Sequence, residues 1–388
     1  MDASFIPISH PQRALEELHA ETERAVLDVL ASGQYILGEA TSAFEAEACR
    51  YLSTSHAIGV SSGTDALVIA LQALDVGPGD EVITTSYSFI ATATCIARLG
   101  ARPVFVDIDP ATYQMDPEVL AAAITPRTRA IITVHLYGHP APMSRYMRAA
   151  ETGDEPIALI EDAAQAIGTV CSVESTAGGE AELRKAGSIG LFGCFSFYPT
   201  KNLPACGEAG LLVTGQPAQA ERARQLRNHG QDSTYHHVRL CGNSRLDAIQ
   251  SAILRVRLEH LDRWNDNRRS TAAFYNRAFT EAGLVGSEVH LPPETANGEV
   301  ANFHQYTLRV TGRDGLLQTL RDQGIGAGVY YPLPLPFQPV FADLGYQQGE
   351  FPEAERAAQE VLSLPSHQHL RSDEIERVAA AVVAYYRG

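Results

Sequence analysis

The sequence lacks long apolar runs, an excess of positive charge and a basic leader segment. No apolar stretch of its 388 residues approaches the roughly 20 residues needed to span a bilayer. The start, MDASFIPISHPQRALEEL, has no basic segment followed by an apolar core, as a secretory signal would. The formal net charge of −16 disfavours nucleic-acid and anionic-membrane partners, because both need a basic face. We therefore expect a cytoplasmic protein without such partners.

Paired cysteines are also missing. The six cysteines are scattered, and the closest two, Cys194 and Cys206, lie twelve positions apart without any CxxC motif. This spacing disfavours a zinc site or a redox pair and favours free thiols. His135 and His139 stand four apart in HLYGH, but no other ligand is obvious nearby, so a loop is the simpler interpretation. We expect no metal site.

Short apolar runs do alternate with helix-length segments between about residues 56 and 215. Runs of this kind, rich in β-branched residues, predict a mostly parallel sheet covered by helices on both faces. Ligands of such α/β sheets bind beyond the carboxyl ends of the strands. The expected strands are HAIGV, DEVITT, RPVFVDI, RAIITVHLYG, PIALIEDAAQ, CFSFY and AGLLVTG.

The pattern changes after Gly215. We predict helices over 217–228, 245–282 and 352–364, a strand over 302–310, and irregular structure in the proline-rich segment 330–341. The length suits one large domain and a smaller one. We place the large domain, with its N-terminal helix, at residues 1–259 and a smaller α/β domain at 260–388. The helix near 11–31 is expected to pack beside the smaller domain.

Three segments could carry chemistry. In VSSGTDAL, small residues follow a strand and open a helix, so backbone N–H groups and the Ser62, Gly63 and Thr64 region could bind an anion. No Gly-Lys-Ser/Thr follows and no GxGxxG is present, which argues against a Walker loop or a nicotinamide site. The alternative is that Ser62 or Thr64 only caps the helix.

The second segment, LIEDAAQAIG, ends an apolar strand with two acids. A carboxylate there is costly unless a cation or a hydrogen-bond donor meets it. Asp162 and Gln165 are three apart and could face one ligand; the alternative is a capping aspartate at the next turn.

In the third segment, CFSFYPTKNLP, Ser196 and Lys201 are five apart. A lysine in an apolar, partly desolvated pocket loses its charge more easily, and a neutral amine is the form that attacks a carbonyl. The alternative is an ordinary solvated lysine at a turn.

Together, a phosphate cradle, an acid at a strand end and a desolvated lysine are what pyridoxal 5'-phosphate requires. The cradle holds the phosphate, the acid keeps the pyridine nitrogen protonated, and the lysine holds the aldehyde and moves the proton. The order of the three segments along the chain also fits this cofactor.

The sequence resembles the sugar aminotransferase family named after DegT, DnrJ, EryC and StrS, over nearly its whole length. The resemblance implies the aspartate-aminotransferase fold (fold type I), with a large domain around a mostly parallel sheet. The motifs that carry it include SGQYILG, VSSGTDALVIAL, GPGDEVIT, PVFVDIDPATYQMDPE, IEDAAQAIG, FSFYPTKNL, NHG, GNSRLDAIQSAIL, YYPLPLPFQP and LSLP.

The resemblance also assigns roles by position. Lys201 resembles the lysine that binds the cofactor and Asp162 the partner of the pyridine nitrogen; both are expected to be catalytic. Asn243 matches an asparagine that reaches the phosphate of the other subunit, which implies a homodimer with shared active sites. The expected cofactor contacts are Ser62, Gly63, Thr64, Phe89 (stacked on the ring), Asp162, Gln165 (beside the ring hydroxyl), Ser196, Lys201 and Asn243.

The implied activity is transfer of an amino group from glutamate to a nucleotide-linked keto sugar. The segment VHLYG resembles relatives that aminate carbon 3, and the region 228–254 resembles the group acting on UDP-2-acetamido-2-deoxy-3-oxo-glucuronate. A guanidinium can bind the carboxylate of that sugar bidentately, with Arg245 as the candidate and pairing with Asp247 as the alternative. The expected substrate contacts are Arg245, His229 and Tyr331.

Other activities remain open on the same fold: a carbon-4 or cyclitol aminotransferase, a sugar dehydratase, or a regulator without turnover. Lys201 favours transamination, since some dehydratases of the family have histidine there. The chain departs from the family pattern in the long, acidic segment 171–186, in Pro336 where histidine is common, and in Tyr330 where many relatives have histidine. These departures leave the sugar contacts less defined than the cofactor contacts.

Overall fold

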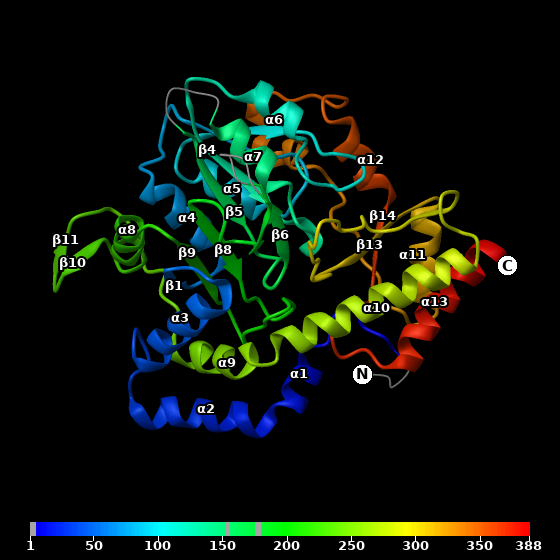
Figure 1. Cartoon of the computed structure of the whole chain (residues 1–388), viewed down its shortest axis with the longest axis horizontal. Coiled ribbons are helices and arrows are strands. Elements are labelled where there is room, and N and C mark those ends of the chain that lie inside the picture. Colours follow the sequence, from blue (N-terminus) through cyan, green and yellow to red (C-terminus); the bar gives the residue numbers. More distant parts are fainter. Residues whose placement is uncertain (1–4, 152–155, 175–179) are drawn as a thin grey trace.

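A seven-stranded sheet forms the centre of the computed structural model, which describes residues 5–151, 156–174 and 180–388 (Figure 1). The strand order is β1-β9-β8-β5-β4-β2-β3. Only β9 runs antiparallel to its neighbours, so the mostly parallel α/β sheet is confirmed. The strands are β1 (His56–Val60), β2 (Glu81–Thr85), β3 (Arg102–Val106), β4 (Thr128–Val134), β5 (Ala158–Asp162), β8 (Phe192–Ser196) and β9 (Gly210–Thr214).

Helices cover both faces of this sheet. The adjacent residues Ile131 and Ile132 of β4 belong to two different apolar clusters, one on each side. A strand that is buried on both faces explains the continuous apolar runs in the sequence. The covering helices are α3 (Glu39–Leu52), α4 (Gly63–Ala73), α5 (Ala91–Ala97), α6 (Pro117–Ala123), α7 (Met143–Ala150) and α8 (Pro217–Arg227).

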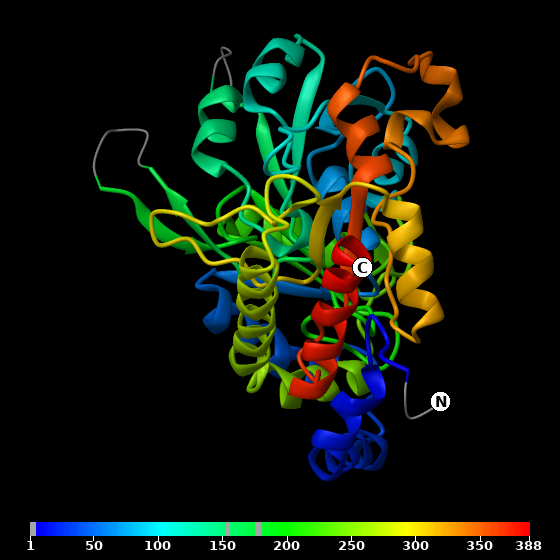
Figure 2. The same ribbon diagram turned by 90° about the vertical axis from the view of Figure 1, so that its right-hand side faces the viewer.

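The C-terminal third builds a second core around a three-stranded antiparallel sheet of order β12-β13-β14. Helices α10 and α13 lie side by side against it (Figure 2). The elements are α10 (Leu261–Glu281), β12 (Val289–His290), β13 (Tyr306–Val310), α11 (Arg313–Asp322), α12 (Pro352–Glu360), β14 (Val361–Leu364) and α13 (Ser372–Arg387).

The two N-terminal helices, α1 and α2, pack against different parts of the chain. In α2 (His19–Ser32), Val29 packs on Ala248 and Ala252 of α9 (Ala248–Leu258), so the expected packing of the whole 11–31 segment on the smaller domain is wrong. Helix α1 (Pro11–Glu17) does contact the C-terminal part of the chain, where Arg13 Nη2 lies 2.6 Å from Glu374 Oε1 of α13.

Two predicted helices end early. The segment 245–282 is two helices, because α9 stops at Leu258 and α10 starts at Leu261; no proline or glycine marks the break. The segment 352–364 is helical only to Glu360, since Val361–Leu364 pairs with β13. Here tertiary pairing overrides local helix propensity. As expected, 330–341 has only short 3-10 turns, Leu335–Phe337 and the first part of Pro339–Leu344.

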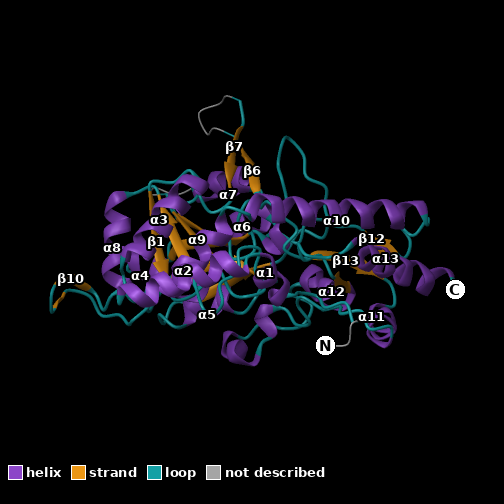
Figure 3. Cartoon of the chain, turned by 90° about the horizontal axis from the view of Figure 1, so that it is seen from below, coloured by secondary structure: helices purple, strands orange, loops and turns teal. Residues whose placement is uncertain are grey.

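Two hairpins project from the body (Figure 3). The first joins β6 (Val170–Val173) and β7 (Glu182–Lys185) within the acidic segment 171–186, of which 175–179 lie outside the described residues. The second joins β10 (Gln231–Ser233) and β11 (His236–His237). No helix in the described part of the chain is both long and apolar enough to cross a membrane.

Candidate active site

A cavity of about 580 Å³ opens at the carboxyl ends of β1, β4, β5 and β8. We call it the active-site cavity. It brings together nine of the twelve residues proposed from the sequence, although the most distant two, Ser62 and Tyr331, are 269 positions apart. These nine are Ser62, Gly63, Thr64, Phe89, Asp162, Gln165, Ser196, Lys201 and Tyr331.

One end of the cavity is formed by the start of α4. Ser62 is its N-cap, and its Oγ accepts a hydrogen bond from the Asp65 N–H at 3.1 Å, so the capping alternative holds for this hydroxyl. The N–H groups of Gly63 and Thr64, the first two residues of the helix, have no acceptor within the helix and are available to bind an anion. A Cβ on Gly63 would lie 2.8 Å from Ser196 Cβ, so only glycine lets the two strand ends meet. The result is a compact cradle of hydroxyl and N–H groups.

Asp162 is the buried acid of the cavity, with 5% of its surface exposed. Burial raises the pKa of its carboxyl group. Hydrogen bonds from Thr92 Oγ1 at 2.8 Å and from the Ala164 N–H at 3.2 Å, with the nearby Lys201 charge, act in the opposite direction. A carboxylate held in this way favours a cationic partner, such as a protonated ring nitrogen.

Both the oxygen and the nitrogen of the Gln165 side-chain amide make hydrogen bonds. Its Oε1 accepts the Tyr137 N–H at 2.6 Å, and its Nε2 donates to the Tyr331 hydroxyl at 3.1 Å. The side chain therefore has one orientation and holds Tyr331 at the cavity wall.

Lys201 follows β8 in a turn in which its N–H donates to Tyr198 O at 2.8 Å. Burial lowers the pKa of its amine to about 8, although the Asp162 carboxylate acts to raise it. A substantial neutral fraction near neutral pH is what a nucleophilic amine needs. The alternative of a solvated surface lysine does not fit this environment.

Phe89 lies at the mouth of the cavity, with 53% of its surface exposed. Its ring centroid is 6.1 Å from that of Tyr331. An exposed aromatic face at this place can cover a flat ring.

Three proposed residues lie outside this cavity. Asn243 and His229 are exposed on neighbouring backbone segments, where the His229 N–H donates to Gly242 O at 3.0 Å. Arg245 Nη1 donates to Asn228 Oδ1 at 2.8 Å. Asp247, the alternative partner of Arg245, instead caps α9 by accepting the Gln250 N–H at 2.8 Å.

The cavity also contains residues that the sequence did not reveal. His304 lines it, and its Nδ1 lies 3.0 Å from Asn202 Oδ1. Burial first, and then the charges of Lys201 and Arg268, hold the pKa of His304 well below its usual range, so the ring is neutral. It lies within the predicted strand 302–310 but before the observed strand β13, 103 positions beyond Lys201, and no motif marks it. Thr92, which orients Asp162, was equally hidden inside a helix.

The two histidines of HLYGH face the protein interior. His135 Nε2 lies 2.9 Å from Glu161 Oε2, and its Nδ1 accepts the Ala141 N–H at 3.0 Å. His139 is buried, and burial lowers its pKa to about 4. Within the described ranges, no group of three or more His, Cys, Asp and Glu is arranged to hold a metal.

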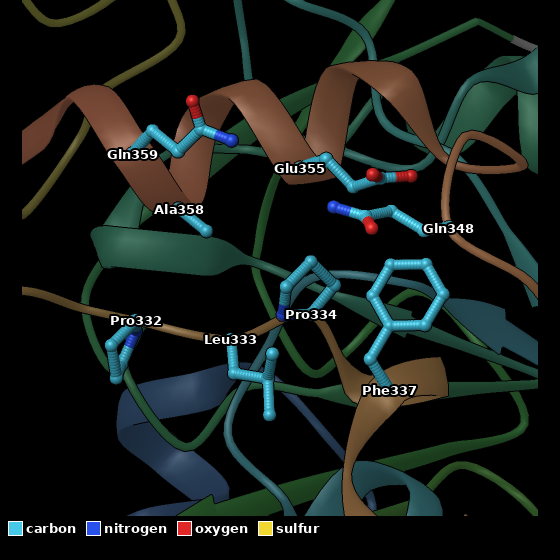
Figure 4. Close-up of a pocket in the computed structure, with 8 residues that line it drawn as sticks. All are labelled: Pro332, Leu333, Pro334, Phe337, Gln348, Glu355, Ala358 and Gln359. Carbon is cyan, nitrogen blue, oxygen red and sulfur yellow. The ribbon is translucent and has the colours of Figure 1, made fainter. Parts of the chain in front are cut away.

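A second hollow lies between the proline-rich segment and α12 (Figure 4). Two prolines, Leu333 and Phe337 form half of its wall, and its one carboxylate, Glu355, accepts hydrogen bonds from the N–H groups of Gly349 and Phe351. It offers no nucleophile or base. Of the departures from the family pattern, Tyr330 lines the active-site cavity, whereas Pro336 is buried and lines neither hollow.

Comparison with known proteins agrees with this geometry. The sequence profile of the DegT/DnrJ/EryC1/StrS aminotransferase family matches residues 16–383. A relative from Geobacillus stearothermophilus, named as a pleiotropic regulatory protein, is 45% identical over 98% of this chain and 99% of its own. The UDP-N-acetyl-3-dehydro-alpha-D-glucosamine 3-aminotransferase of Acidithiobacillus ferrooxidans is 42% identical over 97% of each chain. The UDP-2-acetamido-2-deoxy-3-oxo-D-glucuronate aminotransferase of Pseudomonas aeruginosa is 37% identical over 97% and 99%.

Solved structures resemble the whole chain. The crystal structure of DesV from S. venezuelae, in complex with a ketimine intermediate, superposes with a TM-score of 0.92 at 41% identity and covers 100% of both chains. NtdA from Bacillus subtilis, solved with its cofactor PMP, superposes with a TM-score of 0.89 at 29% identity and covers 100% of this chain and 86% of its own.

Proposed function

The chain belongs to the DegT/DnrJ/EryC1/StrS aminotransferase family and is a pyridoxal-phosphate-dependent aminotransferase of nucleotide-linked keto sugars; we propose that it transfers the amino group of glutamate to carbon 3 of a 3-oxo sugar. Two relatives whose names specify a 3-oxo or 3-dehydro UDP-sugar support carbon 3. The single observation that carries the chemistry is the cavity that unites Lys201, Asp162 and the start of α4.

The residues present fit pyridoxal phosphate. The N–H groups and hydroxyls at Ser62, Gly63, Thr64 and Ser196 would hold its phosphate, because the cradle has no side chain at Gly63 to fill it. Asp162 would meet the ring nitrogen, and Phe89 would cover the ring face. When bound, the cofactor supplies an electron sink for the carbon that loses its proton.

The chain's own residues do the remaining work. Asp162 would hold a proton on the ring nitrogen, since a facing cation stabilises its buried carboxylate. Lys201 Nζ would move the proton that leaves the donor's α-carbon, and a pKa of about 8 lets the amine both accept and release a proton near neutral pH. The nearby His304 does not compete for that proton, because burial holds its pKa well below the usual range and makes it a weak base.

A purely regulatory role is the second candidate, because one relative is named as a regulator. Burying a lysine and an aspartate in one cavity destabilises both charges. A regulator without turnover gains nothing from this cost, so the cavity supports catalysis.

The substrate assignment is tested by turnover. With glutamate as donor, the protein should aminate UDP-2-acetamido-2-deoxy-3-oxo-glucuronate and the corresponding neutral 3-oxo sugar, and leave 4-oxo sugars unchanged. Formation of 2-oxoglutarate and of the amino sugar is followed together. Efficient turnover of a 4-oxo sugar with none of a 3-oxo sugar would refute carbon 3.

We also propose a homodimer with shared sites, in which Asn243 completes the partner's phosphate cradle. Exposed Asn243 lies outside its own cavity, next to the projecting β10–β11 hairpin, where Tyr235 is 89% exposed. Mixing Asn243→Ala and Lys201→Ala chains should form hybrids in which one site carries both changes and the other carries neither. Activity should therefore exceed that of either parent. Proven subunit exchange without recovery would show that each site is built from one chain.

Arg245 remains the proposed partner of a uronate carboxylate, now from the neighbouring subunit, because it lies outside its own cavity. Arg245→Ala should weaken transition-state binding of the uronate by about 2–4 kcal/mol, as when a buried charge pair is broken, and of the neutral sugar much less. Equal losses for both sugars would reject this role alone.

A further inference from the structure

His304 turns one ring nitrogen toward the protein interior and leaves the other free for a ligand. Its Nδ1 lies 3.0 Å from Oδ1 of Asn202, a residue that is 2% exposed and lines no hollow, whereas His304 lines the active-site cavity and a small hollow next to it. The two nitrogens point in nearly opposite directions from an imidazole ring, so Nε2 points away from Asn202. None of the described residues forms a hydrogen bond with Nε2, and the atom is not fully enclosed, so a ligand in the cavity can reach it.

A network of buried asparagines determines which atom of the Asn202 amide faces this ring. Asn202 Nδ2 lies 3.3 Å from the backbone carbonyl oxygen of Asn302 and 2.7 Å from Oδ1 of Asn265. A backbone carbonyl only accepts hydrogen bonds, so the amide atom that meets it must be the nitrogen. Asn265 is oriented in the same way, because its Nδ2 donates to Ile167 O at 3.1 Å. The atom of Asn202 that faces His304 is therefore its oxygen.

This orientation fixes the tautomer of His304. An amide oxygen cannot donate, so Nδ1 must carry the proton of the 3.0 Å hydrogen bond. A neutral imidazole has a proton on only one nitrogen, and Nε2 therefore keeps its lone pair. Burial, and then the charges of Lys201 and Arg268, hold the pKa of His304 well below its usual range, so a second proton does not bind near neutral pH. The nitrogen that a ligand can reach is an acceptor only.

The backbone of His304 is fixed as well as its ring. Its N–H donates to Asn302 Oδ1 at 2.9 Å, and Asn302 Nδ2 donates to Gln165 O at 3.1 Å. Asn302 is fully buried, and a Cβ on Gly138 would lie 1.8 Å from its Oδ1, so only glycine leaves room for this amide. Asn302 thus ties His304 to Gln165, which lines the same cavity. The acceptor has a defined place relative to the other groups of the site.

An acceptor of this kind distinguishes the two substrates. Apart from its reacting amino group, glutamate offers only carboxylate oxygens, which accept hydrogen bonds and are repelled by a lone pair. The keto oxygen of the sugar is also an acceptor, whereas a sugar hydroxyl or an amide N–H donates. His304 lines the cavity together with Lys201, which must reach the carbon that exchanges its amino group. The donating group therefore stands on a carbon next to that one.

We propose that His304 Nε2 accepts a hydrogen bond from the sugar, donated by the hydroxyl on carbon 4 or by the acetamido N–H on carbon 2, and so determines how the keto carbon is presented to Lys201. Asn202 is a positioning residue, because it acts only through the tautomer of His304. The inference rests on the proposed amination of carbon 3, whose two neighbours are carbons 2 and 4.

The first test deletes the acceptor and keeps the bond to Asn202. His304→Asn retains an amide group where Nδ1 stands and has no atom at the place of Nε2, whereas His304→Gln reaches that place with an amide oxygen. The reverse half-reaction with a UDP-linked 3-amino sugar is followed by stopped-flow absorbance of the cofactor. His304→Asn should raise the sugar concentration needed for half-maximal rate about 3- to 10-fold, the loss expected for one neutral hydrogen bond. His304→Gln should restore part of this loss.

The half-reaction with glutamate separates this role from a general loss of structure. In His304→Asn it should keep both its rate and its dependence on glutamate concentration. His290→Asn is the matched control, because His290 is an exposed histidine of β12 that does not line the cavity. It should leave both half-reactions unchanged.

The second test removes the donating group from the sugar. With the unchanged enzyme, the 4-deoxy or the 2-deoxy analogue of the 3-amino sugar should show a similar loss of about 3- to 10-fold. His304→Asn should add nothing to the loss of the analogue that lacks the true partner, and this identifies the group that His304 binds. Both analogues suffering the full additional loss in His304→Asn would overturn the proposal, as would no loss with either analogue in the unchanged enzyme.

The third test reads the tautomer directly in the cofactor-free protein and needs no turnover. Solid-state ¹⁵N NMR of the histidine-labelled protein should show a protonated Nδ1 and an unprotonated Nε2 for His304, assigned by their absence from His304→Asn. Asn202→Leu should lose this preference and weaken the sugar half-reaction alone. A proton on Nε2 in the unchanged protein would overturn the proposal even if the variants fail to fold.

The remaining outcomes separate His304 from the proposed function. An unchanged sugar dependence in folded His304→Asn, or equal losses in both half-reactions, overturns the role of His304 and leaves carbon 3 standing. An enzyme that accepts only 4-oxo sugars refutes carbon 3, and the same comparison of analogues then tests His304 against the hydroxyl on carbon 3.

Discussion

Replacing Lys201 by methionine should stabilise the cofactor-free protein at neutral pH. Burial lowers the pKa of Lys201 from 10.5 to about 8. Each unit of difference between folded and unfolded pKa corresponds to about 1.4 kcal/mol, so the charged amine costs at most about 3.5 kcal/mol in the folded state. Methionine fills similar space without a charge. Because Lys201 also lowers the pKa of Asp162, the variant loses that favourable interaction, and the gain should fall below this bound.

The two pKa values of Lys201 determine how the stability difference between the variant and the unchanged protein changes with pH. Below pH 8 both the folded and the unfolded lysine carry the proton, so the full cost is present. Between pH 8 and 10.5 the unfolded chain binds more protons than the folded one, so stability rises with pH. Above 10.5 the cost is gone. The advantage of Lys201→Met over the unchanged protein should therefore shrink steadily across this window.

Urea unfolding followed by the fluorescence of the single tryptophan, Trp264, measures this difference at pH 7, 8, 9, 10 and 10.5. Ionisation of tyrosines affects both proteins and cancels in the difference. Lys185→Met is the matched control, because Lys185 Nζ lies 3.3 Å from the ring centroid of Tyr51. Burial lowers the pKa of Lys185 too, but this variant also loses the contact with the Tyr51 ring, worth about 0.5–1 kcal/mol, so its gain should be smaller than that of Lys201→Met. A Lys201→Met advantage that is absent at pH 7, or constant from pH 7 to 10.5, would refute a desolvated Lys201.

Two further substitutions test the cofactor contacts. Asp162→Ala should keep the cofactor bound through its phosphate but reduce turnover by at least about 10²–10³-fold, the loss expected for a preorganised electrostatic partner; a near-normal rate would exclude the role of Asp162. Gly63→Ala should weaken cofactor binding about 10- to 100-fold, because its Cβ would lie 2.8 Å from Ser196 Cβ and such overpacking costs about 1–3 kcal/mol. Gly77→Ala, with nothing within 4 Å of the added Cβ, should bind the cofactor normally, and equal affinities of the two variants by equilibrium dialysis would show that the cradle is not tight.

The sequence predicted the parts of the fold that local patterns determine. Continuous apolar runs identified the parallel strands because these strands are buried on both faces. The break between α9 and α10 carries no proline or glycine, so it was invisible. Val361–Leu364 forms a strand only because β13 lies beside it, and that contact joins residues about 55 positions apart.

The candidate site also contains residues that local sequence patterns reveal and residues that only tertiary contacts bring in. Asp162 and Lys201 could be found because each follows a strand at the edge where ligands bind. His304 enters the active-site cavity from the segment just before β13, which carries no motif. Its position beside Lys201 is a tertiary feature, which only the folded structure reveals.

The central claim, that Lys201 holds the cofactor, has a direct test. Borohydride treatment of the yellow enzyme should remove its visible absorbance band and leave the cofactor covalently attached, and peptide mapping should locate it on Lys201. The only other lysine of the sequence is Lys185, which lies over the Tyr51 ring outside the active-site cavity. The mapping therefore has two lysines to distinguish. An adduct on Lys201 alone is the predicted result, and an adduct on Lys185, or none, would contradict the account.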